Sequence, residues 1–316
     1  MTDHAEDGTR RLSRRARLNA LPPNVRGALW MIGAASMFAL MTVVGKILGA
    51  TFDPLQITWA VQVVALVIVV PVALAAGRPL LPRGRRVMHV VRALCGYSGF
   101  ICFLIAIQFL PLADAVSLSF ATPLFMVVWA ALFLGESVRW RRATATAIGF
   151  VGVVVMMRPG QAAIEPAALV AILGAMFGAT AMTLIKRLTV HDDNVTLMAS
   201  FAIVAGIAGV GPALWVWQMP GWSDLPWLAA IGLGGVAGQY MLIRAYRAGE
   251  ASVVAPFDYS RLILSTILGY LVFREVPDLW TGVGAAIIIA STFYIARREA
   301  RRGIAPAVTP GGGVNP

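Results

Sequence analysis

The chain of 316 residues is 59% hydrophobic and only 13% charged, and it carries a formal net charge of +11. Soluble globular domains are about half apolar and about a quarter charged, so this composition excludes an ordinary soluble domain and indicates a protein of the lipid bilayer. The basic residues lie in short runs between apolar segments and do not form one solvated patch. We therefore expect them to flank a membrane, and we expect no nucleic-acid partner.

The cysteines and histidines lack the patterns that bind metals or build disulfide frameworks. Cys95 and Cys102 lie seven residues apart in one apolar run, while His4, His89 and His191 lie in or beside polar stretches. Structural zinc sites need closely spaced pairs of these residues, and disulfide scaffolds need several cysteine pairs. The sequence therefore predicts no disulfide, no metal site and no cofactor.

Ten apolar runs follow one another along the chain, each roughly 20 residues long, which is the length that crosses a hydrocarbon core about 30 Å thick. A polar, arginine-rich tail of residues 1–25 precedes the first run, which lacks a cleavage site and is expected to remain as a helix. The Gly- and Pro-rich residues 300–316 are predicted to be a disordered tail. The predicted fold is all-α integral membrane, with about ten transmembrane helices at residues 27–47, 54–76, 87–110, 112–134, 140–157, 166–187, 194–217, 226–247, 250–273 and 277–296.

The basic residues also predict the orientation, because the cytoplasmic loops of membrane proteins collect Lys and Arg. With ten crossings, 22 of the 26 Lys and Arg residues lie on the side of the two termini, and only Lys46, Arg158 and Arg274 lie on the opposite side. We therefore expect both termini in the cytoplasm. The excess of Arg over Lys and the lack of a eukaryotic sorting signal favour a bacterial inner membrane.

Sequence landmarks recur once along the chain and indicate an internal repeat. A unit of five helices crosses the membrane an odd number of times, so a second copy is inverted and leaves a central cavity between the halves. We predict a first repeat at residues 26–160 and a second at residues 161–299. The landmarks, each pair 139 residues apart, are Met37-Phe38 with Met176-Phe177, Glu136 with Glu275, and Arg158 with Arg297.

Two stretches, one in each half, resemble the EamA-type permeases of the drug/metabolite transporter superfamily. Residues 92–136 read RALCGYSGFICFLIAIQFLPLADAVSLSFATPLFMVVWAALFLGE, and residues 238–275 read GQYMLIRAYRAGEASVVAPFDYSRLILSTILGYLVFRE. The first stretch is similar to the family's pattern of a proline in the fourth helix, here Pro123, followed by a Leu-Gly-Glu end. The second departs from it, since Pro256 lies further from its end and Arg replaces the Gly.

The resemblance covers nearly all of residues 26–298 and implies a secondary transporter of small metabolites, often an exporter of amino acids or related compounds. It implies no particular substrate, because the superfamily is broad.

Asp258 and Arg261 lie about 8 and 11 residues into the ninth apolar run, which places both near the membrane midplane. Their spacing puts them on one face of a helix. One hypothesis is that the two charges only neutralise each other. The other is that Arg261 binds a substrate carboxylate while Asp258 holds an ammonium group or a coupling proton.

Polar side chains near Asp258 and Arg261 or at similar depth in other runs complete the candidate substrate site. Pro123 and Pro256 interrupt helical hydrogen bonding and are expected to kink their helices at a cavity, or simply to serve packing. The other residues are expected either to bind substrate or to form hydrogen bonds between helices. They are Tyr97, Ser98, Thr122, Gln239, Tyr240 and Tyr259.

The function that the sequence predicts is secondary transport of a small polar metabolite by alternating access, driven by its own gradient or by protons. The preferred substrate is an amino acid or related carboxylate, with export as the favoured direction. The alternative is an uptake permease for a nucleoside-like or vitamin-like metabolite. A membrane enzyme is the remote alternative, because no H-E-x-x-H or Gly-x-Ser-x-Gly motif occurs. The oligomeric state is not predicted.

Overall fold

A computed structural model of the chain describes residues 22–134, 140–157, 165–188, 191–248 and 254–303. All of the regular secondary structure in these residues is helical, which confirms the predicted all-α class. The helices are α2 (Pro23–Leu48), α3 (Pro54–Ala75), η1 (Arg83–Arg85), α4 (Arg86–Phe109), α5 (Leu112–Ser119), α6 (Thr122–Leu134), α7 (Trp140–Met157), α8 (Pro166–Leu188), α9 (Asn194–Trp215), α10 (Leu225–Ala248), η2 (Ala255–Tyr259), α12 (Ser260–Phe273) and α13 (Leu279–Gly303).

Each of the ten predicted apolar runs contains helix. In the described part of the chain, seven helical segments are long and apolar enough to cross a membrane, counting α5 and the start of α6 together as one segment, Leu112–Trp129. The remaining three runs contain shorter apolar helices in α7, α12 and α13. The chain is therefore a multi-pass membrane protein.

Local capping chemistry explains where several helices begin and end. Asp53 accepts a hydrogen bond from the backbone N–H of Leu55 at 2.8 Å and precedes Pro54, the first residue of α3. Asp193 caps α9 in the same way, through the N–H of Thr196. Both arrangements satisfy backbone donors that a helix start leaves free. Arg274 ends α12 in the left-handed conformation, with φ of 60°.

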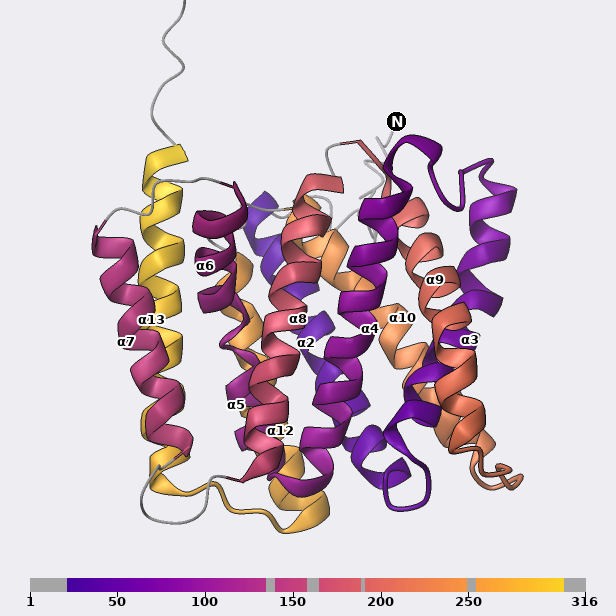
Figure 1. The fold of residues 1–316 in the computed structure, drawn as a ribbon. Helices are drawn as coiled ribbons and strands as arrows, with labels where there is room; N and C mark the ends of the chain where they lie inside the picture. Colours follow the sequence, from indigo (N-terminus) through magenta and orange to yellow (C-terminus); the bar gives the residue numbers. More distant parts are fainter. Residues whose placement is uncertain (1–21, 135–139, 158–164, 189–190, 249–253, 304–316) are drawn as a thin grey trace, which may run out of the picture.

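Helix pairs that join the two halves of the chain form most of the bundle (Figure 1). In each pair, a helix from residues 23–157 packs against one from residues 166–303. At one crossing, a Cβ on Gly99 would lie 3.1 Å from the carbonyl oxygen of Gly174, so the backbones of α4 and α8 approach closely. The main pairs are α2 with α10, α4 with α8, α3 with α9, and α7 with α13.

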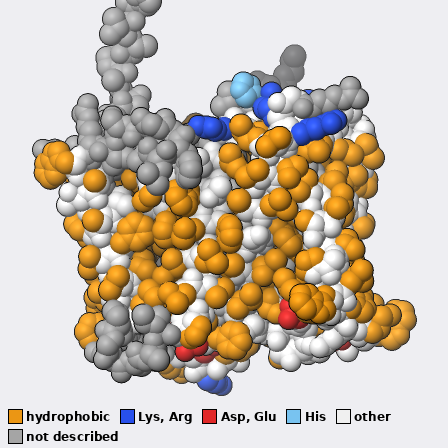
Figure 2. All heavy atoms as spheres, in the orientation of Figure 1, with side chains coloured by type: hydrophobic (Ala, Val, Ile, Leu, Met, Phe, Trp, Pro, Cys, Tyr) orange, Lys and Arg blue, Asp and Glu red, His pale blue; other side chains and the backbone are white. Residues whose placement is uncertain are grey.

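The bundle has two ends. We call the end near the two chain termini the terminal face and the opposite end the distal face. The terminal face contains the start of α2 and the end of α13, and the distal face contains the end of α2 and the start of α13 (Figure 1). Hydrophobic side chains cover the middle of the molecule between these faces, and Lys and Arg side chains gather toward the terminal face (Figure 2). This apolar belt is the surface that lipid tails cover.

The fourth and ninth runs are each divided into two helices near Pro123 and Pro256, where the sequence predicted a kink within a single span. α5 ends at Ser119 and α6 begins at Thr122, because Pro123 has no N–H to donate to the carbonyl oxygen of Ser119. The hydroxyl of Thr122 donates to this oxygen instead, at 2.7 Å. The ninth run contains η2, a 3-10 helix with Pro256 in its first turn, before α12. Residues 250–253 of the predicted ninth span lie outside the described residues.

Candidate functional site

The two helix interruptions meet inside the bundle. The guanidinium of Arg261, the second residue of α12, donates a hydrogen bond to the hydroxyl of Ser119 at the end of α5, at 3.2 Å. Its Cζ lies 5.1 Å from the ring centre of Phe120, and that ring contacts the ring of Tyr259 edge to face at 4.9 Å. One arginine and two aromatic rings therefore lie together where both helices are broken.

Arg261 lies far from the distal face of the bundle. Twelve residues separate it from Phe273 at the distal end of α12, which is about 18 Å at the rise of an α-helix. Its Nε is buried and has no hydrogen-bond partner, and Arg261 forms no ion pair among the described residues. A charged group at this depth without full compensation is costly, and in membrane proteins it commonly marks a functional site.

Asp258 and Arg261 do not form an ion pair with each other, although their spacing of three residues predicted a shared helical face. Asp258 belongs to η2, whereas Arg261 belongs to α12. A 3-10 helix has about 3.0 residues per turn, so the angular spacing changes at this junction. Asp258 is half-buried, and its carboxylate has no ion-pair partner in the described part of the chain.

The other predicted site residues do not form a single cluster. Thr122 lies at the α5–α6 interruption and donates to Ser119, and its hydroxyl lies near Gly178 of α8. Tyr97 of α4 is buried, and its hydroxyl lies against Gly209 of α9 without a hydrogen-bond partner. Ser98 is half-buried.

Tyr240 lies on the exposed side of α10. Its side chain is 47% exposed, its hydroxyl accepts a hydrogen bond from Nε of Arg244 at 3.0 Å, and its ring contacts Trp30 of α2. Gln239 is half-buried beside it. The structure therefore brings Thr122, Tyr259 and Arg261 to the helix interruptions and leaves Tyr240 at the surface.

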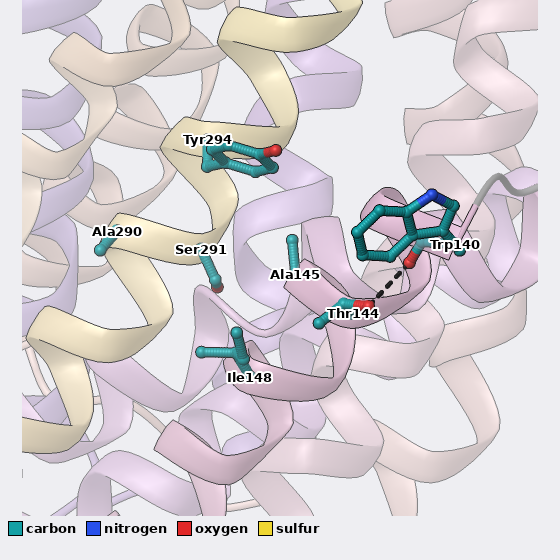
Figure 3. Close-up of a pocket in the computed structure, with 7 residues that line it drawn as sticks. All are labelled: Trp140, Thr144, Ala145, Ile148, Ala290, Ser291 and Tyr294. Atoms are coloured by element: carbon teal, nitrogen blue, oxygen red, sulfur yellow. Dashed lines mark hydrogen bonds between the residues drawn. The ribbon is translucent and has the colours of Figure 1, made fainter.

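A groove of about 420 Å³ lies between α7 and α13. In Figure 3, Trp140 and Tyr294 project over it, and Ser291 and Thr144 lie on its walls. Trp140 is 71% exposed and Tyr294 is 48% exposed. The groove contains none of the predicted substrate residues, and its mainly apolar walls suit a lipid-facing surface.

An ion pair at the distal face connects the two halves, and sequence reasoning missed it. Lys46 at the end of α2 pairs with Oε1 of Glu275, which follows α12, and also donates to the carbonyl oxygen of Leu110 at 2.8 Å. Oε2 of Glu275 accepts from the backbone N–H of Leu112, the first residue of α5, at 2.8 Å. The only sequence signal was the recurrence of Glu275 with Glu136.

A second polar network joins the halves near the terminal face. Arg85 donates two hydrogen bonds to Asp192, at 2.8 and 3.0 Å. His89 lies between Asp192, at 3.2 Å, and the hydroxyl of Ser200, at 2.8 Å. The hydrogen bonds from the Arg85 guanidinium hold the pKa of Asp192 below its usual value.

The order Asp192, His89, Ser200 resembles the side-chain order of a hydrolase triad. A nucleophilic serine must reach its substrate, but Ser200 has no exposed surface. The network thus connects α4 with the segment that leads into α9. Among the described residues, no group of three or more His, Cys, Asp or Glu side chains could hold a metal ion.

Comparison with known proteins identifies the family. The model of the EamA-like transporter family matches residues 25–158 and again residues 165–297. A crystal structure with 20% sequence identity superposes with a TM-score of 0.59 over 89% of this chain and 99% of its own, which shows a shared fold.

Three relatives illustrate the functions found among similar proteins. The riboflavin transporter of Rhizobium johnstonii is 32% identical over 290 residues, covering 90% of this chain and 95% of that protein. The S-adenosylmethionine uptake transporter of Rickettsia prowazekii is 28% identical, covering 89% and 96%. The pseudopaline exporter of Pseudomonas aeruginosa is 27% identical, covering 86% and 96%. This chain therefore belongs to the EamA-like transporter family and is a multi-pass membrane transporter.

Proposed function

We propose that the protein is a secondary transporter that binds a carboxylate-bearing, amino-acid-like metabolite at Arg261. The observation that carries this proposal is the deep guanidinium, which has a buried Nε without a partner and no carboxylate paired with it in the described residues. A planar guanidinium fork suits a carboxylate, which accepts two parallel hydrogen bonds. The substrate would supply the anion that the described residues do not supply.

The aromatic rings beside Arg261 support a substrate that also has a flat or apolar part. Phe120 and Tyr259 lie at an edge-to-face angle next to the guanidinium. S-adenosylmethionine combines an α-amino carboxylate with a purine, so the name of the Rickettsia relative fits both features. Asp258, half-buried in η2, is the proposed partner for an ammonium group or a coupling proton.

A vitamin-like substrate is the second candidate, favoured by the 32% identity to the riboflavin transporter. Riboflavin has no carboxylate, so its binding would rely on aromatic contacts and hydrogen bonds. Relatives include both uptake transporters and an exporter, so family membership does not decide the direction. We keep export as the proposed direction.

We further propose that the two halves, residues 26–160 and 161–299, are inverted five-helix repeats that alternate around Arg261. The helix pairs support this. In this repeat, the helices α2, α3, α4 and α7 correspond to α8, α9, α10 and α13. Exchanging corresponding helices converts the α2–α10 pair into the α8–α4 pair, and it leaves the α3–α9 and α7–α13 pairs unchanged. A two-fold axis has this property, and because each half has an odd number of crossings, the proposed axis lies in the membrane plane. The Lys and Arg count supports a cytoplasmic terminal face in a bacterial inner membrane.

The test uses purified protein in liposomes that contain unlabelled substrate, with labelled S-adenosylmethionine or riboflavin added outside. Losing hydrogen bonds to a charged group costs about 1.5–3 kcal/mol, so Arg261→Gln should weaken exchange of a carboxylate substrate by between about tenfold and a hundredfold. Arg244→Gln is the matched control, because Arg244 is exposed on α10. Riboflavin exchange that Arg261→Gln leaves unchanged would overturn the carboxylate proposal in favour of the vitamin-like one.

A further inference from the structure

α5 and α12 run antiparallel along a shared face that leads from Arg261 to the distal face. Arg261 contacts Ser119 at one end of this face, at 3.2 Å. At the other end, a Cβ on Gly269 would lie 3.6 Å from Cβ of Leu112. Residues 261, 265 and 269 recur every four positions, so they lie on one side of α12. We call this contact between Arg261, Ser265 and Gly269 of α12 and Leu112 and Ser119 of α5 the seam.

The seam contains polar atoms that the closed bundle leaves unsatisfied. Ser265 has no exposed surface, and its hydroxyl has no hydrogen-bond partner, like Nε of Arg261 one turn earlier. Unsatisfied polar atoms are unfavourable in a helix interface inside a membrane, where no water compensates them. If the seam opens to water or substrate during transport, the Ser265 hydroxyl and Nε of Arg261 both gain hydrogen-bond partners in the open state.

The Lys46–Glu275 ion pair closes the distal end of the seam. Glu275 accepts from the N–H of Leu112, so it holds the start of α5 against the end of α12. Lys46 links both to α2 through Glu275 and the carbonyl oxygen of Leu110. The side chains of Lys46 and Glu275 are 14% and 20% exposed, so water reaches the pair. A partly hydrated ion pair adds little net stability, which allows it to break in each cycle.

The geometry points to the seam as the substrate route between Arg261 and the distal face, with Ser265 as the next substrate contact and Lys46–Glu275 as its latch. This inference rests on the proposed function, because it takes Arg261 as the substrate site. The substrate is the carboxylate-bearing metabolite, whose carboxylate accepts from Arg261 and then from the Ser265 hydroxyl. Gly269, with no side chain, leaves room beyond Ser265 once Leu112 and the Glu275 carboxylate, whose Oε2 would lie 3.3 Å from a Cβ on Gly269, move away.

A reversible crosslink tests the route. Leu112→Cys and Gly269→Cys would place two Cβ atoms about 3.6 Å apart, within the range for a disulfide. The background carries Cys95→Ala and Cys102→Ala, which removes both native cysteines. We expect oxidation to lower exchange in liposomes at least tenfold and a reductant to restore it. The single-cysteine variants under the same oxidant are the controls. Unchanged exchange by the fully crosslinked protein would overturn the route.

Ligand-dependent melting of the crosslinked protein separates the two proposals. In alternating access the substrate site opens to the terminal face while the distal end is closed, so the melting shift should persist while exchange is lost. A shift that Arg261→Gln abolishes, together with full exchange by the crosslinked protein, would leave the proposed function intact and reject the seam. Loss of exchange without any Arg261-dependent shift would reject the proposed function, and the seam as a route to Arg261 with it.

Ser265→Ala tests the substrate contact, with Ser117→Ala as a matched control. Ser117 of α5 is also buried and without a hydrogen-bond partner, but it lies two residues from Ser119 and therefore on another side of the helix. Ser265→Ala should raise the KM at least fivefold and leave the melting temperature unchanged or higher. Ser117→Ala should leave the KM within twofold. Equal KM values for both variants and the parent would overturn the role of Ser265.

Discussion

Arg261 of α12 and Ser119 of α5 are 142 residues apart in the sequence, yet the guanidinium donates a hydrogen bond to the serine hydroxyl at 3.2 Å. Both residues lie where their helices are interrupted near a proline. The hydroxyl of Ser119 in turn donates to the carbonyl oxygen of Val116, at 2.6 Å. The arginine that we propose to bind substrate is therefore oriented by the opposite half of the chain.

Removing the Ser119 hydroxyl should weaken this orientation without removing the charge. We expect Ser119→Ala to lower the free energy of unfolding by about 1 kcal/mol and substrate affinity by a few fold, because one partly buried hydrogen bond is lost. Thermal melting and exchange in liposomes measure the two effects. Ser36→Ala on α2, whose hydroxyl bonds only within its own exposed turn, is the control. Full affinity in Ser119→Ala would mean that Arg261 needs no support from α5.

The Lys46–Glu275 pair should show coupling between its two partners. Glu275→Gln leaves Lys46 without its carboxylate, and Lys46→Met leaves Glu275 without its ammonium, so each single variant should be less stable than the parent. The double variant should recover part of the loss, with a coupling free energy of about 0.5–3 kcal/mol. Thermal melting of the parent, the two single variants and the double variant in detergent completes this double-mutant cycle. Strictly additive losses would show that the two side chains do not interact.

The network around Asp192 should stabilise the protein in a pH-dependent manner. Hydrogen bonds from Arg85 lower the pKa of Asp192 in the folded state, so this stabilisation is present above the usual carboxyl pKa and is lost as the pH falls through the lowered value. Asp192→Asn should cost about 1.5–3 kcal/mol near pH 7. The difference in melting temperature between parent and variant should shrink below about pH 4.

The neighbouring exposed His191 provides the control for this pH dependence. His191→Gln should melt like the parent from acidic to neutral pH. If the difference in melting temperature between Asp192→Asn and the parent stayed constant down to pH 3, this result would contradict a lowered pKa of Asp192.

Two glycines of α9 make a matched pair for packing. A Cβ on Gly209 would collide with the hydroxyl of Tyr97 and lie 2.9 Å from Cδ1 of Trp59, whereas a Cβ on Gly211 would meet nothing within 4 Å. Gly209→Ala should cost about 1–3 kcal/mol through overpacking. Gly211→Ala should leave melting unchanged or raise it slightly, because Ala favours helix more than Gly does. Equal melting temperatures of the two variants would show that the Tyr97 side chain moves aside without a measurable cost in stability.

The length of each apolar run was enough to predict the helices, since every predicted run contains helix. The interruptions at Ser119–Thr122 and in η2 were partly foreseeable, because Pro123 and Pro256 lie there. Their extent depends on side-chain hydrogen bonds, such as Thr122 to Ser119, that no composition rule predicts.

The inward face of each helix was harder to predict. In a bilayer both the lipid and the bundle interior are apolar, so hydrophobic periodicity does not separate them. Tyr240 was therefore expected at the substrate site, although it lies on the exposed side of α10. The pairing of Lys46 with Glu275 joins positions 229 residues apart and follows only from the packing of α2 against α12.

The central claim, that Arg261 binds the substrate carboxylate, is tested most directly by a melting shift with two matched ligands: an amino-acid-like substrate such as S-adenosylmethionine, and the same compound with its carboxylate converted to a carboxamide. At one hundred times the dissociation constant, bound ligand stabilises the folded protein by about 2.7 kcal/mol. We predict a shift with the acid alone, its loss in Arg261→Gln, and its retention in Arg244→Gln. Equal shifts with acid and amide, or a shift that survives Arg261→Gln, would contradict the account.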